Sequence, residues 1–324
     1  MHNAGNGGKK GIISPENETR VNVSVTLVSE RRAMSPTSPD QPLAKRPYNE
    51  SVSLSVVGLG GIVTLDASQE HANELVAWGF DQGINYFDVA PSYGNGEAEV
   101  KLGNALKPYR ERAFLACKTT RRDAAGSRKE LERSLRRLHT DRFDLYQFHA
   151  VTTLTDVEEI FGAGGAAETF LKAHQEGLIR HIGFSAHSEE AALAMMGRFQ
   201  FDSILFPVNA VCYAQGRFGP AVIKRAQEKG IARLALKALA KGPWPEHEPR
   251  DYPKCWYKPT DEPSFAERAL RFTLSEPVTA ALPPGDERLF RLAVNIARSF
   301  SPMGEAEKQE LLAETAGMRP LFPL

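Results

Sequence analysis

The chain has 324 residues, and its 40 lysine and arginine residues balance 40 aspartate and glutamate residues, so no overall charge attracts nucleic acid or an anionic membrane. No apolar stretch reaches the roughly 18 residues that a membrane-spanning helix needs. The three cysteines lie far apart and form no CxxC pair, which favours reduced thiols in a cytoplasmic protein without a metal site: Cys117, Cys212 and Cys255.

The N-terminal residues 1–43 are rich in Gly, Asn, Ser, Pro and Lys, which predicts a mostly disordered arm. Within this arm the run VNVSVTLV (21–28) has a strand-like composition, but few neighbouring segments share its pattern. The remaining residues, 44–324, are expected to fold as one domain.

The rest of the chain alternates strand-like and helix-like segments. Short runs rich in β-branched and aromatic residues predict strands at 53–60, 85–90, 114–118, 144–149, 181–185, 203–209, 232–238 and 278–283. The segments between them predict helices at 68–83, 96–106, 127–139, 166–177, 189–198, 219–230 and 265–276, with an eighth starting near Arg288. This alternation predicts a parallel (β/α)8 TIM barrel, with residues 305–316 as an added C-terminal helix.

Four polar residues lie at or just past the ends of three successive predicted strands: Asp88, Tyr93, Lys118 and His149. Parallel strands deliver their last residues to the same end of a barrel, so we expect these side chains to converge. Lys118 is expected to lower the pKa of the Tyr93 phenol, while Asp88 keeps Lys118 charged. A carbonyl oxygen between Tyr93 and His149 would then be polarised and protonated, with hydride supplied by a cofactor.

The segment GINYFDVAPSYGNGEAEVKLG (83–103) resembles the signature of the aldo-keto reductase family. The matching positions are Asp88, Tyr93, Glu97, Leu102 and Gly103, and the spacings from Tyr93 to Lys118 and from Lys118 to His149 are also similar. The resemblance runs from about residue 44 to the C-terminus. It implies NAD(P)H-dependent reduction of an aldehyde or ketone, in a divergent bacterial-type branch without an iron-sulfur extension. In that scheme Tyr93 is the general acid, Lys118 and Asp88 tune it, and His149 orients the carbonyl.

The same resemblance implies where the cofactor binds. Gly60 and Gly61 correspond to backbone that passes beside the cofactor, although GLGGIV (58–63) is no GxGxxG motif. Asp88 is also expected beside the cofactor, and Ser185 and Asn209 are expected to hold the nicotinamide carboxamide. Ala186 stands where the family has an Asn.

Further along the chain the resemblance places Leu236 against the nicotinamide and Lys237 beside it. Arg291 and Asn295 correspond to the family's adenosine-phosphate ligands. Where NADP-preferring members have Lys and Ser, this chain has Gly285 and Asp286. Arg291 still offers a guanidinium to the 2′-phosphate, so NADP(H) is expected to be slightly favoured over NAD(H).

Other interpretations stay open. Related barrels can serve as cofactor-bound sensors or partner subunits, and Lys118 or Lys237 would suit a Schiff-base aldolase. A metal hydrolase using Asp88, His149 and His187 lacks the usual ligand spacing. The aromatic-rich segment 241–263 is expected to overhang the site, either covering a small-molecule carbonyl substrate or packing as a lid. The sequence indicates no oligomeric state.

Overall fold

The computed structural model describes residues 42–322, so nearly all of the predicted arm, including the run 21–28, lies outside the described residues. Leu43, assigned to the arm by the sequence, is buried, and its N–H donates to the carbonyl of Gln82 at 2.8 Å. The packing of the folded domain therefore includes this residue.

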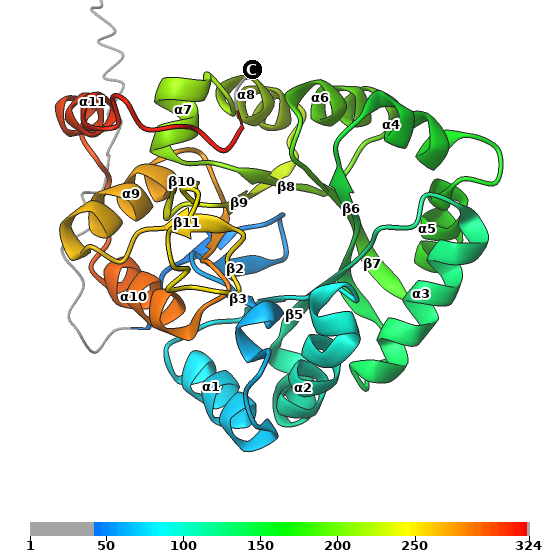
Figure 1. Ribbon diagram of the computed structural model, residues 1–324. Coiled ribbons are helices and arrows are strands. Elements are labelled where there is room, and N and C mark those ends of the chain that lie inside the picture. Colours follow the sequence, from blue (N-terminus) through cyan, green and yellow to red (C-terminus); the bar gives the residue numbers. More distant parts are fainter. Residues whose placement is uncertain (1–41, 323–324) are drawn as a thin grey trace, which may run out of the picture. The chain divides into compact units, whose positions relative to one another are not determined.

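Eight parallel strands form the centre of the domain (Figure 1). They are β3 (Leu59–Gly60), β4 (Tyr86–Asp88), β5 (Phe114–Thr119), β6 (Phe143–Val151), β7 (Ile179–Ala186), β8 (Ser203–Pro207), β9 (Ala232–Leu236) and β12 (Ala280–Leu282). Consecutive strands are neighbours in the sheet. The two edges meet where Val57 bridges Ala281 and Gly58 N–H donates to the Ala281 carbonyl at 3.0 Å. The predicted (β/α)8 barrel is confirmed.

Helices surround the strands. Those at predicted positions are α1 (Gln69–Asp81), α2 (Glu97–Leu106), α3 (Ala124–Arg137), α5 (Ala166–Gln175), α6 (Glu189–Arg198), α8 (Pro220–Glu228), α9 (Pro263–Ser275) and α10 (Glu287–Arg298), followed by the added helix α11 (Glu305–Glu314). The sequence did not predict α4 (Leu154–Phe161) or α7 (Ala210–Gly216). Both are short and depend on caps, since Thr153 and Asp156 form a capping box for α4. Within residues 42–322, no helix is long and apolar enough to cross a membrane.

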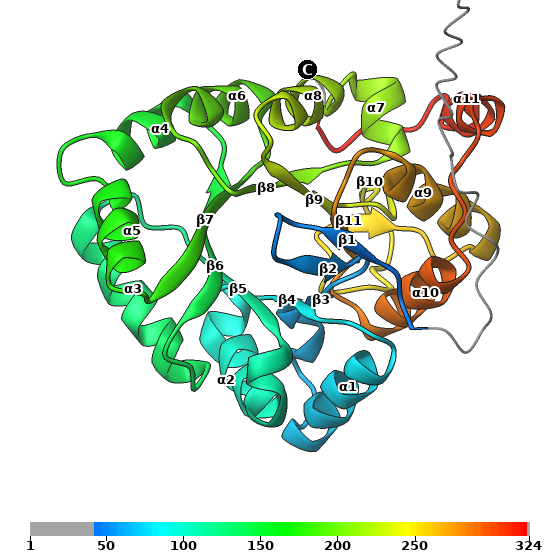
Figure 2. The ribbon, with the colours of Figure 1, turned by 180° about the vertical axis from the view of Figure 1, so that it is seen from behind.

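The prediction of one strand over residues 53–60 is wrong. Ser53–Ser55 is β2, which pairs antiparallel with β1 (Lys45–Pro47), whereas pairing with the barrel begins at the Val57 bridge and continues in β3. This hairpin lies across one end of the barrel (Figure 2). Its buried residues Tyr48 and Leu54 pack among side chains of the barrel interior, and the Tyr48 hydroxyl donates to Ser203 Oγ at 3.1 Å. The hairpin therefore closes the end of the barrel where the strands begin.

The segment after β9 crosses the opposite end. It starts and finishes with an antiparallel pair, β10 (Ala240–Pro243) and β11 (Tyr257–Pro259), where the sequence pattern predicted no strands. Residues 244–256, here called the strap, lie between these strands. The Lys254 ammonium donates to the carbonyls of Val63 and Leu65, which lie in and just after the 3-10 turn η1 (Gly61–Thr64). The strap is thereby tied to the loop that follows β3.

Candidate active site

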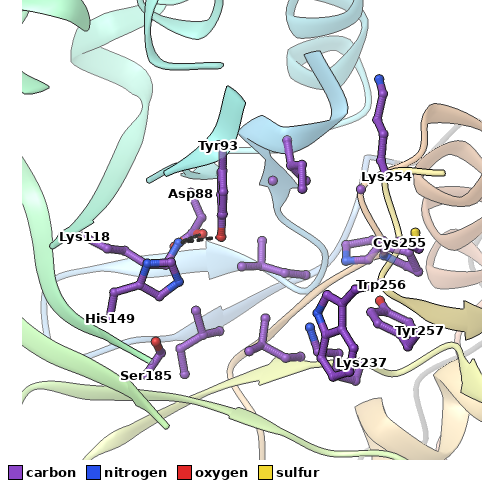
Figure 3. A pocket seen from close by; sticks show the side chains of 18 of the residues that line it. Asp88, Tyr93, Lys118, His149, Ser185, Lys237, Lys254, Cys255, Trp256 and Tyr257 are labelled. Carbon is purple, nitrogen blue, oxygen red and sulfur yellow. Dashed lines mark hydrogen bonds and ion pairs between the residues drawn. The ribbon is translucent and has the colours of Figure 1, made fainter. Parts of the chain in front are cut away.

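A cavity lies at the C-terminal ends of the barrel strands (Figure 3). All eight strands contribute to it, most of them with residues at or near their C-terminal ends or with the residues that follow. Its lining consists of Gly60, Ile62, Asp88, Tyr93, Lys118, His149, Ser185, His187, Leu205, Leu236, Lys237, Lys254, Cys255, Trp256, Tyr257, Leu282, Pro283, Pro284 and Gly285. Figure 3 shows Tyr93, His149 and Ser185 on one side, facing the strap and Lys237 on the other.

The four predicted catalytic residues meet in this cavity. The Lys118 ammonium is paired with the Asp88 carboxylate and lies 3.4 Å from the Tyr93 hydroxyl. The Tyr93 and His149 rings face each other edge-on, with centroids 6.1 Å apart. Tyr93 starts the turn η2 (Tyr93–Gly96), in which Gly94 and Asn95 have positive φ angles of 58° and 52°. A side chain at position 94 would overlap Leu65, so this turn depends on glycine.

Asp88 is buried and held on both carboxylate oxygens. Besides Lys118 it accepts hydrogen bonds from Gln147 Nε2 at 3.1 Å and from the Tyr86 hydroxyl at 3.4 Å. Burial raises the pKa of Asp88, and the Lys118 charge counteracts this only in part. Burial lowers the pKa of Lys118, but the charges of Asp88 and Tyr93 outweigh that effect and the net direction is upward. Lys118 therefore stays protonated near neutral pH.

The expected lowering of the Tyr93 pKa is wrong as a net effect. Burial raises the pKa of the phenol, Lys118 lowers it, Asp88 raises it again, and the sum is a raised pKa. The prediction considered the partner charge and omitted the cost of burying a phenolate. The phenol is accordingly protonated at neutral pH and is available as a donor.

His149 is an uncharged ring. Burial, followed by the charge of Lys118, holds the pKa of His149 well below its usual value. Within residues 42–322 its buried Nδ1 atom has no hydrogen-bond partner. The strand end is fixed through its backbone, because Arg122 donates to the His149 carbonyl at 2.9 Å and Ala150 N–H donates to Ser185 Oγ at 2.8 Å.

Six of the ten residues expected at the cofactor line the cavity. Besides Asp88 they are Gly60, Ser185, Leu236, Lys237 and Gly285. A Cβ at Gly285 would overlap the side chain of Ile62, so the turn after β12 passes the β3 loop at a distance that suits glycine. Gly61 lies behind the lining, where a Cβ would come within 2.8 Å of Val89. The small residues, the Lys237 ammonium and the buried Ser185 hydroxyl suit the carboxamide and phosphates of a dinucleotide.

Comparison with known proteins supports this interpretation. The model of the Aldo/keto reductase family matches residues 56–298. The chain belongs to this family. Aldo-keto reductase YhdN of Bacillus subtilis (strain 168) is 30% identical over 203 residues, which make up 59% of this chain and 59% of that protein. The uncharacterized oxidoreductase YqkF of the same organism is 25% identical over 297 residues, covering 82% of this chain and 94% of that protein.

Two solved structures of the family have the same fold. The holo form of aldo-keto reductase AKR11C1 from Bacillus halodurans has a TM-score of 0.65 at 26% identity, covering 85% of this chain and 96% of that one. An aldo-keto reductase from Klebsiella pneumoniae in complex with NADPH has a TM-score of 0.66 at 20% identity, with the same coverage of both chains. The resemblance inferred from residues 83–103 is thus confirmed at the level of family and fold.

The remaining cofactor residues expected from this family resemblance lie outside the cavity lining. Asn209 is buried and caps α7, its Oδ1 accepting from Cys212 N–H at 2.8 Å. Arg291 donates to Glu287 Oε1 at 2.8 Å and its guanidinium lies 4.2 Å from the Trp78 ring centroid. Asn295 is exposed on α10. The sequence has the expected residue types at these positions. It does not show that Asn209 and Arg291 already form hydrogen bonds within the protein.

One important contact was missed by the sequence analysis. Gln147 is fully buried and donates to Asp88, and it lies two residues before His149 on β6. Residues two apart on a strand face the same side, so an amide in the apolar run DLYQFH was a usable signal. Gln147 is a positioning residue because it acts through Asp88.

Proposed function

We propose that this protein reduces an aldehyde or ketone to an alcohol, using NAD(P)H. One observation carries the proposal: a protonated phenol, Tyr93, lies 3.4 Å from a buried ammonium and faces a neutral imidazole across an accessible cavity. Membership of the aldo/keto reductase family supports it. The nicotinamide supplies the hydride when it is bound, since no protein side chain donates one.

Each residue then has a defined task. Tyr93 donates its proton to the carbonyl oxygen as negative charge develops there. Lys118 stabilises the phenolate left behind, and Asp88, supported by Gln147, keeps the ammonium charged and in place. The uncharged ring of His149 donates a hydrogen bond to the same oxygen and so orients the carbonyl.

The cavity residues also define the proposed cofactor site. Ser185 accepts from Ala150 N–H and keeps its hydroxyl proton for the carboxamide, while Leu236 provides an apolar surface for the nicotinamide ring. Gly60 and Gly285 let the backbone approach the cofactor closely. We propose NADP(H) as the cofactor, because the Arg291 guanidinium can bind a 2′-phosphate. The advantage over NAD(H) is small, because Arg291 must first release Glu287.

A Schiff-base reaction at Lys118 has no support in this geometry. An imine-forming lysine must be unprotonated, whereas Asp88 raises the pKa of Lys118. Borohydride trapping in the presence of aldehyde tests the same chemistry at Lys237.

The substitution Tyr93→Phe tests the proposal because it removes the hydroxyl and little else. NADPH and NADH oxidation is measured against a panel of aldehydes and ketones, and we expect kcat to fall by about 10²-fold or more. The dissociation constant of the cofactor should stay within a factor of about two. Tyr109→Phe, a tyrosine outside the cavity that stacks on Phe80, is the matched control. Full turnover by Tyr93→Phe would refute the assignment.

A further inference from the structure

Lys237 lies in the cavity on the side facing the catalytic residues (Figure 3). It is the first residue after β9, and its φ angle of 67° belongs to the left-handed region that non-glycine residues seldom adopt. Its ammonium lies 5.0 Å from the ring centroid of Trp256 and 4.8 Å from that of Tyr257. An unusual backbone conformation and two aromatic faces thus hold one cation at the cavity wall.

The other charged groups of the lining are already engaged. Asp88, the one carboxylate in the lining, binds Lys118, Gln147 and Tyr86. Lys254 donates to two backbone carbonyls in the β3 loop. For Lys237, by contrast, no carboxylate, carbonyl or hydroxyl within residues 42–322 accepts a hydrogen bond from the ammonium.

The titratable groups around Lys237 do not balance its charge. Burial raises the pKa of Cys255 to about 11 and that of Tyr257 well above its usual value, so both are neutral at pH 7. His149 and His187 are also neutral, and Lys118 adds a like charge. Among residues 42–322 the cation therefore has no compensating anion, which is costly for a partly buried ammonium even with aromatic neighbours.

We propose that Lys237 is the anion-binding residue of this cavity and takes a phosphate or carboxylate oxygen of a ligand. Given the proposed function, that oxygen belongs either to the diphosphate of the dinucleotide or to an acidic group on the carbonyl substrate. Trp256 and Tyr257 present the ammonium to the ligand without neutralising it. Burial lowers the pKa of Lys237 to about 8, and the charge of Lys118 adds to this effect. The ammonium is therefore mostly protonated at neutral pH, and a bound anion would raise its pKa again.

Two substitutions separate charge from structure. Lys237→Met removes the charge at similar length, and Lys237→Arg keeps it. Lys241→Met is the matched control, because the Lys241 ammonium lies 5.1 Å from the Phe265 ring and is outside the cavity lining. The dissociation constants of NADPH and NADH are measured by fluorescence titration, and kcat/KM is compared for succinic semialdehyde and its uncharged relative butanal.

The two sources of the anion predict different results. If Lys237 binds the diphosphate, Lys237→Met weakens NADPH and NADH alike by about tenfold, and Lys237→Arg restores most of the affinity. If it binds an acidic substrate, cofactor affinity is unchanged and the preference for succinic semialdehyde over butanal falls by about tenfold. The proposal is overturned if neither cofactor affinity nor the preference for succinic semialdehyde changes in Lys237→Met. It is also overturned if Lys237→Arg and Lys237→Met give the same values.

A labelling experiment keeps this test independent of turnover. Acetylation of Lys237 by acetic anhydride is followed by mass spectrometry, and we expect inorganic pyrophosphate or succinate to protect this lysine but not Lys241. If neither pyrophosphate nor succinate slows the acetylation of Lys237, the proposal is contradicted. If no carbonyl compound is reduced at all, the proposed function fails while this measurement still decides the role of Lys237.

Discussion

Two histidine rings in the cavity stay uncharged for the same physical reason. Burial lowers the pKa of His149 well below its usual value and that of His187 to about 4. His187 is also stacked on Phe322 near the C-terminus, with ring centroids 5.2 Å apart, and its buried Nε2 has no partner within residues 42–322. Protonating either ring in the folded protein would bury an unpaired charge.

The fold should therefore lose stability in mild acid. A depressed folded-state pKa means that the unfolded chain binds more protons between about pH 6.5 and 4, so stability falls as pH falls through that window. For His187 alone the loss from pH 7 to pH 5 is about 2 kcal/mol. Urea unfolding at both pH values should show a smaller pH effect in His187→Gln than in the exposed-site control His174→Gln. An equal pH effect in the two variants would contradict this assignment.

At the level of elements, helices α1 and α10 meet beside the β12 turn through a charged corner. Glu287 accepts from Arg291 on its own helix and is bonded to His71 Nε2 of α1 at 2.5 Å. The ring of Trp78, also on α1, packs against the Arg291 guanidinium. Asp286 caps α10 by accepting from Arg288 N–H at 2.9 Å. Glu287 is thus already bonded to Arg291, the residue that we propose as the ligand of the 2′-phosphate.

This corner should control the discrimination between the two dinucleotides. With Glu287→Gln, Arg291 no longer pairs with a carboxylate, so we expect NADPH to bind up to about fivefold more tightly, in line with a partly exposed ion pair. NADH affinity should not change. Fluorescence titration of both cofactors checks this, with Glu314→Gln, which breaks a distant pair with Arg268, as the control. Equal gains for the two cofactors would show that Arg291 does not contact the 2′-phosphate.

At the scale of the whole domain, buried side chains from the strands and from the β1–β2 hairpin pack the interior of the barrel. The hairpin supplies Tyr48 and Leu54 to an interior cluster that also contains Tyr86, Leu205 and Leu282. The barrel closes beside this cluster, where Gly58 donates to the Ala281 carbonyl. A Cβ at Gly58 would overlap the Tyr86 ring and come within 2.9 Å of Leu282 Cδ2. Closure and interior packing therefore depend on the same position.

Gly58→Ala should destabilise the domain because the buried Tyr86 and Leu282 side chains have little space to move. We expect a loss of about 1–3 kcal/mol in the free energy of unfolding, measured by urea titration. Gly197→Ala is the control, since its added methyl group meets nothing within 4 Å on the exposed face of α6. That variant should be unchanged or slightly more stable. Similar stability of Gly58→Ala and wild type would show that the barrel relaxes around the methyl group.

A residue's place in the fold could be predicted from the sequence where the residue lies at the end of a strand. Asp88, Lys118 and His149 were predicted from strand ends alone, and all three line one cavity together with Tyr93. The sequence did not show how a polar side chain with two possible uses is engaged in the fold. The amide of Asn209 caps a seven-residue helix that local pattern did not predict, because so short a helix has little periodicity of its own.

Local patterns in the sequence were enough to predict the alternation of strands and helices, the family, and the four polar residues that line one cavity. These follow from local periodicity and from spacing along the chain. Tertiary structure decided that residues 53–55 close the end of the barrel, that Arg291 pairs with Glu287, and that the Tyr93 pKa rises overall. The reason is physical: burial and pairing depend on residues that are distant in sequence, and burial raises the pKa of this phenol by more than one nearby ammonium lowers it.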